Sequence, residues 1–230
     1  MAIKSGETTY HQAKRGIVQN GLVLNLDAGV DASYDGGTTW RDLEGGNNGT
    51  LANGPTFSSD NGGSVVFDGT DDYLVGGTLD SSVSGNNPWS VSVWFNSNQV
   101  SSRRFAFWLG PGTQSSNQLL AVGHRSSRIE VSHWANDISY GAATLTNGSW
   151  VNASATFDGS TVTAYKDGIN IGTRSTTLSI IGGSYYLATL PGNGNYYMDA
   201  KISSVSVYNR TLSAAEVLQN YNVTRHRFGV

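Results

Sequence analysis

The chain alternates apolar and polar residues over many short segments, with the two-residue period of a β-strand. In residues 89–97, WSVSVWFNS, the odd positions carry Trp, Val, Val and Phe, and the even positions begin with two serines. Similar patterning recurs about a dozen times, as expected for a sandwich or barrel. The segments are 21–29, 64–69, 72–76, 89–97, 103–110, 117–124, 128–134, 149–159, 160–168, 169–175, 184–190, 196–202 and 203–209.

Turn signals separate these segments. Asp-Gly pairs at 158–159 and 167–168 lie between alternating stretches, which is a strong hairpin signal. No long helical period competes with the strands, and no repeat of the kind seen in propellers or solenoids stands out. We therefore predict an all-β fold, a two-sheet antiparallel jelly-roll sandwich with one short C-terminal helix.

That helix is signalled by LSAAEVLQNYN, residues 212–222. Ser213 is a favourable N-cap and Glu216 lies three residues later, which together form a capping box. Leu212 before the cap and Val217 after it can pack as a hydrophobic staple. A helix this short is marginal alone, so it must pack on the sandwich.

Composition narrows the function. Charged residues are 13 % of the chain, 29 of the 230 residues are glycine, and the net charge is −3. That charge argues against a nucleic-acid partner. The absence of cysteine excludes a disulfide framework. No apolar run predicts membrane insertion or a secretion signal. We expect an N-terminal arm at 1–20, one domain at 21–222 and a C-terminal tail at 223–230.

Several segments in this order resemble the laminin G-like, concanavalin A-like jelly-roll superfamily. The matching segments are 65–74, 89–97, 149–172 and 202–222. The most specific is the last, in which a strand is followed by Tyr208, Asn209, Arg210, then Leu212 and Ser213, and a short helix. The resemblance covers roughly residues 20–222 and implies the jelly-roll fold.

A narrower resemblance is to laminin G-like domains of tailed-bacteriophage virion proteins, including cyanophage-like ones. It is carried by residues 21–29, 47–73 and 220–230, with an Arg227-Phe228-Gly229 ending. This resemblance implies a virion surface protein, either a capsid decoration or a tail-associated component. The implied partners are other virion proteins, in a homo-oligomer that is assembled in the host cytoplasm and resides on the virion.

Glucanases of this fold make enzymatic activity the first alternative to test. Retaining glycoside hydrolysis needs two carboxyl groups about 5–5.5 Å apart. The chain has four glutamates, at positions 7, 44, 130 and 216. Glu130 is in a predicted strand but has no carboxylate two or four residues later. We predict no enzymatic activity, with glycoside hydrolase kept as a remote alternative.

The turn in VVFDGTDDYL, residues 65–74, raises the question of calcium. Asp68, Asp71 and Asp72 could supply some of the oxygens that calcium prefers. Alternatively, Asp68 and Asp71 cap the turn by accepting hydrogen bonds from nearby backbone amides, as Asx residues do. The resemblance implies another carboxylate in the strand before Tyr208, where this chain has serines. Asp199 lies slightly upstream, and we expect it to be out of register. We predict no cofactor, with calcium as the alternative.

Aromatic residues suggest a second function, that of a carbohydrate-binding adhesin or lectin that recognises host surface glycans. The doublets at 185–186 and 196–197 should place one ring on each side of a strand. Candidate glycan-binding residues are Trp108, Trp134, Tyr140, Tyr185, Tyr186 and Tyr196. The tryptophans expected in the core are Trp40, Trp89, Trp94 and Trp150.

Basic and aromatic residues at the two chain ends are candidates for docking onto virion partners. The two chain ends contribute Tyr10, Lys14, Arg15, Arg225, Arg227 and Phe228. Four further arginines, at 103, 104, 125 and 128, fall in neighbouring predicted strands. They predict either a solvated face or a docking surface for an acidic partner or sugar acid.

Overall fold

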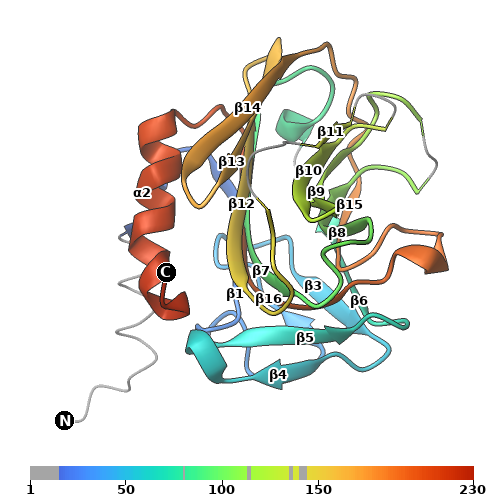
Figure 1. Cartoon of the computed structure of the whole chain (residues 1–230), viewed down its shortest axis with the longest axis vertical. Helices are drawn as coiled ribbons and strands as arrows, with labels where there is room; N and C mark the ends of the chain where they lie inside the picture. Colours follow the sequence, from blue (N-terminus) through green and yellow to red (C-terminus); the bar gives the residue numbers. More distant parts are fainter. Residues whose placement is uncertain (1–15, 80, 113–114, 135–136, 140–143) are drawn as a thin grey trace.

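The computed structural model describes residues 16–79, 81–112, 115–134, 137–139 and 144–230. In this part of the chain, two antiparallel β-sheets pack face to face, and an α-helix lies on the outside of one of them (Figure 1). The predicted all-β sandwich with a short C-terminal helix is therefore confirmed. No described helix is long and apolar enough to cross a membrane.

Sheet A is the sheet that carries the helix. Its strand order is β14 (Ile169–Ser175), β13 (Thr161–Lys166), β12 (Trp150–Phe157), β7 (Trp89–Ser97), β16 (Asp199–Tyr208), β5 (Ser64–Asp68) and β4 (Thr56–Ser58). The first strand, β1 (Leu22–Asp27), pairs with the second half of β16. The segments that alternate most clearly, including 89–97, form the centre of this sheet.

Sheet B faces it across the core. Its strand order is β11 (Ile138–Ser139), β10 (Arg128–Ser132), β9 (Leu120–Arg125), β8 (Arg104–Leu109), β15 (Ser184–Leu187), β6 (Tyr73–Thr78), β3 (Gly49–Ala52) and β2 (Thr39–Trp40). Short 3-10 helices occur in the connections: η1 (Asp60–Gly62), η2 (Ser81–Val83) and η3 (Gly194–Tyr196).

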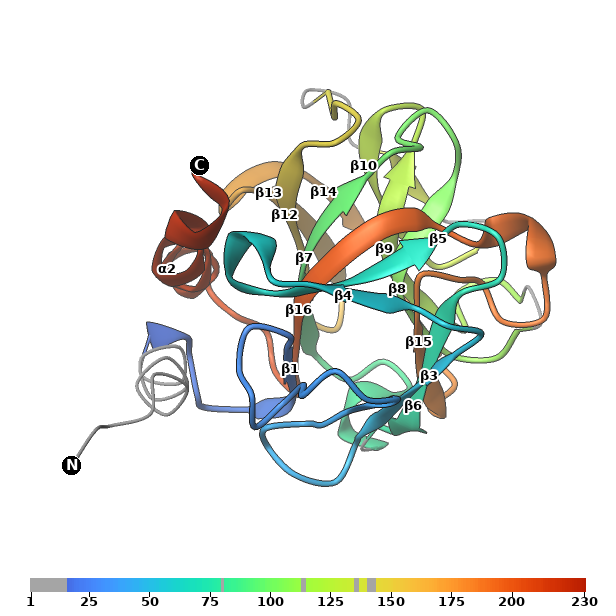
Figure 2. The same cartoon turned by 90° about the horizontal axis from the view of Figure 1, so that it is seen from below.

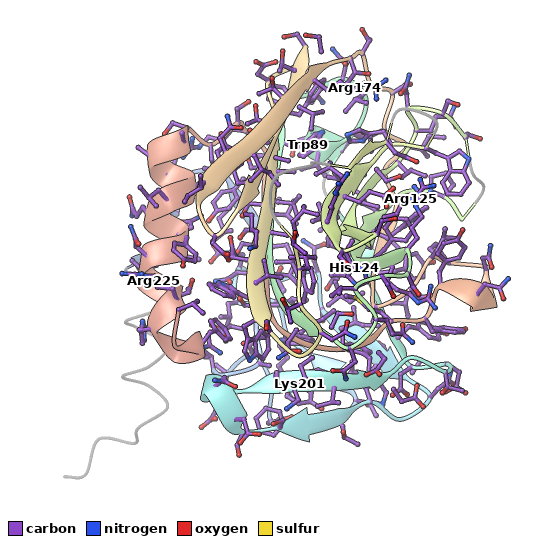
Figure 3. The ribbon with its side chains drawn as sticks, viewed as in Figure 1. Trp89, His124, Arg125, Arg174, Lys201 and Arg225 are labelled. Carbon is purple, nitrogen blue, oxygen red and sulfur yellow. The ribbon has the colours of Figure 1, made fainter. Side chains whose placement is uncertain are left out.

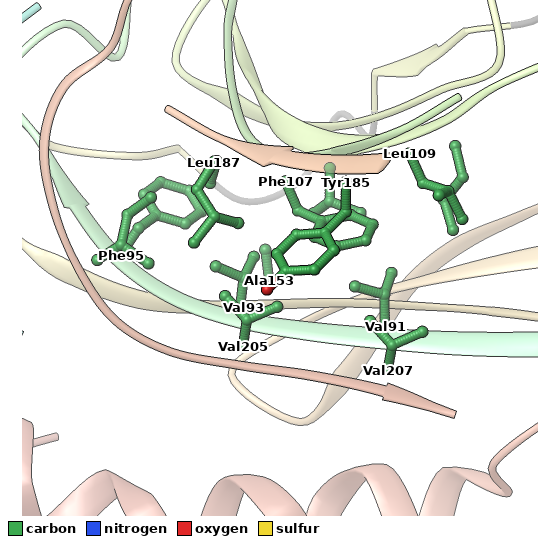
Figure 4. Packing of buried hydrophobic residues seen from close by; sticks show 14 of the residues in the cluster. Val91, Val93, Phe95, Phe107, Leu109, Ala153, Tyr185, Leu187, Val205 and Val207 are labelled. Carbon is green, nitrogen blue, oxygen red and sulfur yellow. The ribbon is translucent and has the colours of Figure 1, made fainter. Parts of the chain in front are cut away.

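The core fills the space between the sheets (Figure 4). Val93 of β7 pairs with Ala153 on one side and Val205 on the other, so small and branched side chains line the inner face of sheet A. Aromatic rings of sheet B, such as those of Phe107 and Tyr185, pack against them. Trp40, Trp89 and Trp94 are buried as predicted, whereas Trp150 is half-buried.

The helix α2 (Ala214–Thr224) packs on the outer face of sheet A (Figures 1 and 2). Its N-terminus is the predicted capping box: Ser213 Oγ accepts from the Glu216 backbone N–H, and the Glu216 carboxylate accepts from the Ser213 backbone N–H. An ion pair with Arg210 and these bonds lower the pKa of Glu216 to about 2. Val217 of α2 packs with Tyr208 of β16 in a small apolar cluster.

Residues just before β1 also belong to this packing. Ile17 is buried in the same cluster, and the Val18 backbone N–H donates to Asn220 Oδ1 of α2 at 2.8 Å. Residues 16–20 of the expected arm therefore pack on the domain, and residues 1–15 lie outside the described residues.

The C-terminal tail folds back onto the domain through η4 (Arg225–Phe228). The Phe228 ring centroid lies 4.1 Å from that of Trp94 and 4.6 Å from that of Trp150. The predicted docking role of Phe228 on a partner is therefore wrong, because its ring is buried against this chain. Arg225, at the α2 side of the molecule, is exposed (Figure 3).

Arg227 is the second internal contact of the tail. Its Nη1 donates to both carboxylate oxygens of Asp27, at 2.9 and 2.8 Å, and its Nη2 donates to Ser203 Oγ at 2.9 Å. The side chains of Arg227 and Asp27 are only 13 % and 7 % exposed, so Arg227 is not available for docking either. We call Arg227, Phe228 and their contacts the C-terminal clamp.

Candidate functional site

The face of sheet B that points away from sheet A is not covered by α2 (Figures 1 and 2). Strand alternation sends Tyr185 of β15 into the core and Tyr186 to this outer face. Trp108 of β8 is the direct neighbour of Tyr186 and lies on the same side. The outer face of sheet B is therefore where several of the predicted aromatic residues converge.

Two of those residues cannot bind a ligand with their rings. Trp108 is fully buried, packed with Phe105 and Leu190 beneath the segment that follows β15. Tyr185 is also fully buried; its hydroxyl donates to the Asn47 carbonyl oxygen at 2.7 Å. Sequence alternation correctly separated Tyr185 from Tyr186, but the assignment of Trp108 and Tyr185 to a glycan site is wrong.

Tyr186 lines an open groove of about 270 Å³ at one end of this face. The groove is built by β6, by β15 and by the segment that links β15 to β16. Its lining residues are Tyr73, Tyr186, Thr189, Pro191, Gly192 and Tyr197. A concave site with ring surfaces and a few polar groups has the character of a small-molecule site.

Two tyrosines of the groove were not predicted. Tyr73 and Tyr197 have ring centroids 6.3 Å apart and ring planes inclined by 33°. Tyr197 belongs to the 196–197 doublet, which precedes β16 and includes the end of η3, so the predicted strand alternation fails there. Tyr196, the member predicted to bind, instead stacks on Phe105 at 5.9 Å and is half-buried. Tyr73 could have been found as the outward residue following the Asp turn.

The Asp turn directly precedes Tyr73. Carboxylate oxygens of Asp68, Asp71 and Asp72 lie within 4.8 Å of one another. Asp68 Oδ1 accepts from the Thr70 backbone N–H at 2.7 Å, and this bond lowers the pKa of the Asp68 carboxyl. Asp72 is buried, which raises its pKa, and its Oδ2 accepts from the Asp68 backbone N–H at 3.0 Å. The Asp68 bond is that of an Asx turn, as predicted, whereas the second bond is accepted by Asp72 and not by the predicted Asp71.

Asp199 lies opposite Asp68 in the ladder between β16 and β5. The expectation that Asp199 would be out of register is therefore wrong. Gly69, with φ +75°, packs so closely that an added Cβ would lie 2.8 Å from Asp199 Cβ, so only glycine fits there. Asp199 Oδ1 accepts from Asn98 Nδ2 at 2.9 Å, a bond to the residue that follows β7.

An ion-pair network occupies the other end of the outer face. Arg103 Nε and Nη2 donate to the two oxygens of Glu130 at 3.1 and 2.5 Å, and Nη2 also donates to Asp137 at 2.6 Å. Glu130 is fully buried, which raises its pKa, while the adjacent Arg103 opposes that change. Ser132 Oγ donates to the second oxygen of Asp137 at 2.5 Å. The network links β8, β10 and the segment after β10.

Trp134 lies beside this network. The Arg103 guanidinium carbon is 5.1 Å from the Trp134 ring centroid, which is a cation–π distance. Trp134 is half-buried, so part of its surface reaches solvent. Of the other predicted residues, Tyr140, Tyr10, Lys14 and Arg15 lie outside the described residues.

The four predicted arginines do not form one surface. Arg103 is engaged by Glu130, and Arg104 Nε donates to Gln99 Oε1 at 2.9 Å. Arg125 and Arg128 are exposed and lie directly opposite each other at the end of the β9–β10 hairpin. Arg125 lies on the sheet B side and Arg225 on the α2 side, so they belong to different surfaces (Figure 3).

Two buried histidines lie on the core-facing side of sheet B. His124 Nδ1 is 3.0 Å from the Ser102 carbonyl oxygen and its Nε2 is 2.9 Å from Ser97 Oγ. His133 Nδ1 is 2.9 Å from the Leu119 carbonyl oxygen, while its buried Nε2 has no hydrogen-bond partner among the described atoms. Because the carbonyls can only accept, Nδ1 carries the proton in both rings. Burial lowers the pKa of each histidine to about 4.

Comparison with known families gives one assignment. The family model described as the concanavalin A-like lectin/glucanases superfamily matches residues 68–218. The matched region contains most of both sheets, the groove and the start of α2. A comparison with curated protein sequences found no match.

Solved structures share the fold at low sequence identity. Domain 4 of AbnA, a GH43 extracellular arabinanase from Geobacillus stearothermophilus, in complex with arabinotriose, has a TM-score of 0.67 at 13 % identity, over 89 % of this chain and 100 % of that chain. The binding domain of Paraclostridial Mosquitocidal Protein 1 has a TM-score of 0.69 at 15 % identity, over 88 % of this chain and 52 % of that chain. Trypanosoma rangeli sialidase in complex with sialic acid has a TM-score of 0.69 at 12 % identity, over 94 % of this chain and 37 % of that chain.

Proposed function

The chain belongs to the concanavalin A-like lectin/glucanase superfamily, and on that premise we propose that it is a non-enzymatic glycan-binding domain. The observation that carries this proposal is the groove in which Tyr73, Tyr186 and Tyr197 meet on the outer face of sheet B. A structural neighbour that was solved with arabinotriose supports a sugar as the class of ligand.

The chemistry of the groove fits a sugar ring. Tyrosine offers an apolar ring face, on which the C–H face of a sugar can pack, together with a hydroxyl that can bond to sugar hydroxyls. The inclined rings of Tyr73 and Tyr197 form one wall, and Tyr186 comes from the neighbouring strand. Thr189 and Pro191 complete the lining from the segment after β15. The groove thus combines apolar surface with a few convergent polar groups.

Binding without hydrolysis is part of the proposal. Glu130, the glutamate considered above as a catalytic carboxylate, lies in β10 and is fully buried. Both of its oxygens accept from Arg103, which also bonds to Asp137. Two carboxylates engaged by the same guanidinium are poorly placed to protonate a leaving group or attack a sugar, which supports a binding role.

A glycan array followed by titration calorimetry tests this function. We expect wild-type protein to bind a defined set of glycans, and Tyr186→Ala to weaken binding about tenfold, the loss of about 1.4 kcal/mol. The matched control is Phe57→Ala, because Phe57 is an exposed aromatic residue (46 %) on β4 of the other sheet. The function is refuted if no glycan binds, or if Tyr186→Ala and Phe57→Ala bind equally well.

We also propose that this domain is carried on a phage particle, as a homo-oligomeric capsid or tail component assembled in the host cytoplasm with other virion proteins. The resemblance of residues 21–29, 47–73 and 220–230 to virion domains supports this, including the ending at Arg227 and Phe228. Glycan binding would then serve recognition of the host surface. Because the C-terminal clamp uses Arg227 and Phe228 internally, attachment is assigned to residues before Gly16.

Deletion of residues 1–15 tests the virion role. The deletion spares Ile17 and Val18, which pack against α2, so the domain should remain folded. We expect the truncated protein to keep its circular dichroism spectrum and its glycan binding but to be missing from purified particles. Incorporation at the wild-type level would contradict attachment through this segment.

A further inference from the structure

The backbone at Trp134 is unusual for an aromatic residue. Its φ is +54°, in the left-handed region that bulky side chains rarely adopt. The other described non-glycine residues with positive φ are asparagine, serine, aspartate and alanine. Strain of this kind persists where the surrounding structure enforces it, and it is concentrated at functional sites.

The surrounding contacts hold the ring in one place. The Arg103 guanidinium lies between two rings, with its carbon 5.1 Å from the Trp134 centroid and 5.2 Å from the Phe105 centroid. Glu130 and Asp137 fix the same guanidinium through its edges. Two cation–π contacts combined with hydrogen bonds to two carboxylates immobilise an arginine in a way that lysine could not. Trp134 is thus an aromatic platform held rigid before any ligand arrives.

This platform shares its face with the groove. Tyr186 pairs with Trp108, Trp108 with Ala121, and Ala121 with Ser132, which is two residues before Trp134. Three steps at the usual strand spacing place the two sites about 14 Å apart, a span longer than one sugar ring. Between them lies the apolar cluster that contains Trp108 and Leu190.

Charge limits the kind of ligand. At the platform, the Arg103 guanidinium is engaged by Glu130 and Asp137 and is only 17 % exposed, and Arg174 Nη1 donates to the Asp137 carbonyl oxygen at 3.2 Å. At the groove, the exposed Asp68 and Asp71 lie just before Tyr73. Among the residues named here, neither the platform nor the groove presents a free cation to a carboxylate or sulfate group. An uncharged glycan suits both ends.

We propose that the groove and the Trp134 platform are two subsites for one linear, uncharged oligosaccharide. The inference rests on the proposed glycan-binding function and specifies its ligand as an internal stretch of a chain, longer than a single sugar. The groove holds one part of the chain, and the rigid ring of Trp134 holds another. Arg103 acts as a positioning residue for Trp134.

Chain-length dependence tests this inference. The probes are neutral arabinan-, xylan- and mannan-derived oligosaccharides, each from the monosaccharide to the hexasaccharide, titrated by calorimetry. We expect affinity for the bound series to rise about tenfold from disaccharide to hexasaccharide. Trp134→Ala should abolish that gain without changing the affinity for the disaccharide, whereas Tyr186→Ala should weaken both.

Further variants guard against misfolding. Trp134→Leu keeps apolar bulk without the ring and should behave like Trp134→Ala, and Phe57→Ala should behave like wild type, with folding checked by circular dichroism. If affinity does not depend on length, or if both Trp134 variants bind the hexasaccharide normally, the platform is refuted and binding at the groove stands. Tighter binding of sialylated than of neutral chains refutes the uncharged ligand. If no probe binds, both proposals fail.

Discussion

Acid should unfold this domain largely through two residues. Neutral His124 and His133 are buried, and burial lowers their pKa from 6.5 to about 4. Because the unfolded chain binds protons at these sites first, the free energy of unfolding should fall as the pH drops from about 6.5 to 4 and then level off. At neutral pH neither histidine is charged in either state, and this penalty is absent.

The magnitude follows from the pKa difference. The interval from 6.5 to about 4 corresponds to about 3 kcal/mol for each histidine, of which about 2 kcal/mol is already lost at pH 5. The two sites together approach the total stability of a typical domain, 5–15 kcal/mol. Glu130 acts in the opposite direction, because its raised pKa favours the folded state as the pH falls.

Urea unfolding at a series of pH values from neutral to 4.5 is the assay, applied to wild type, His124→Gln and His133→Gln. Each variant should be less stable at pH 7, since a buried hydrogen bond is altered, but its stability should depend less on pH than that of wild type by about 2 kcal/mol over the range to pH 5. Single variants leave Glu130 unchanged, so its contribution cancels. Equal pH dependence in wild type and both variants would refute the reasoning.

Two further predictions concern the chain's end and the Asp turn. Phe228→Ala should cost about 3 kcal/mol in urea unfolding, because the ring lies against Trp94 and Trp150; a loss below 1 kcal/mol would mean that the clamp packs loosely. Millimolar calcium should change the melting temperature little, because Asp68 and Asp72 already accept backbone hydrogen bonds. A rise of many degrees that Asp68→Asn removes would show a calcium site.

The sequence predicted the features that depend on local rules. Alternation in residues 89–97 identified β7 and its inward face correctly, because each side chain's direction follows from the pleat alone. The capping box at Ser213 and Glu216 likewise involves residues three apart. The outward position of Tyr186 beside the inward Tyr185 belongs to the same class.

Features that depend on distant segments were not predictable in this way. Trp108 points outward as alternation requires, yet it is buried in an apolar cluster that includes Leu190 from the segment after β15. In the sequence, Arg227 has the character of a free basic residue in the tail. The structure shows that it binds Asp27, which lies 200 positions earlier in the chain. Tyr197 joins Tyr73 in the groove only because the chain leaves the strand pattern at η3. The hydropathy pattern predicts the side of a strand to which a side chain points. Whether a distant segment covers that side chain depends on the topology of the fold.

The C-terminal clamp has a consequence for how the domain is made. Asp27 is among the first residues of the sandwich to leave the ribosome, and its charge is neutralised by Arg227, which is among the last. Until then β1 also lacks β16, the strand with which it pairs, so it cannot take its native place in sheet A. Contacts between such distant residues also form slowly. Native packing of the first strand therefore waits until β16 and the segment that holds Arg227 have been synthesised.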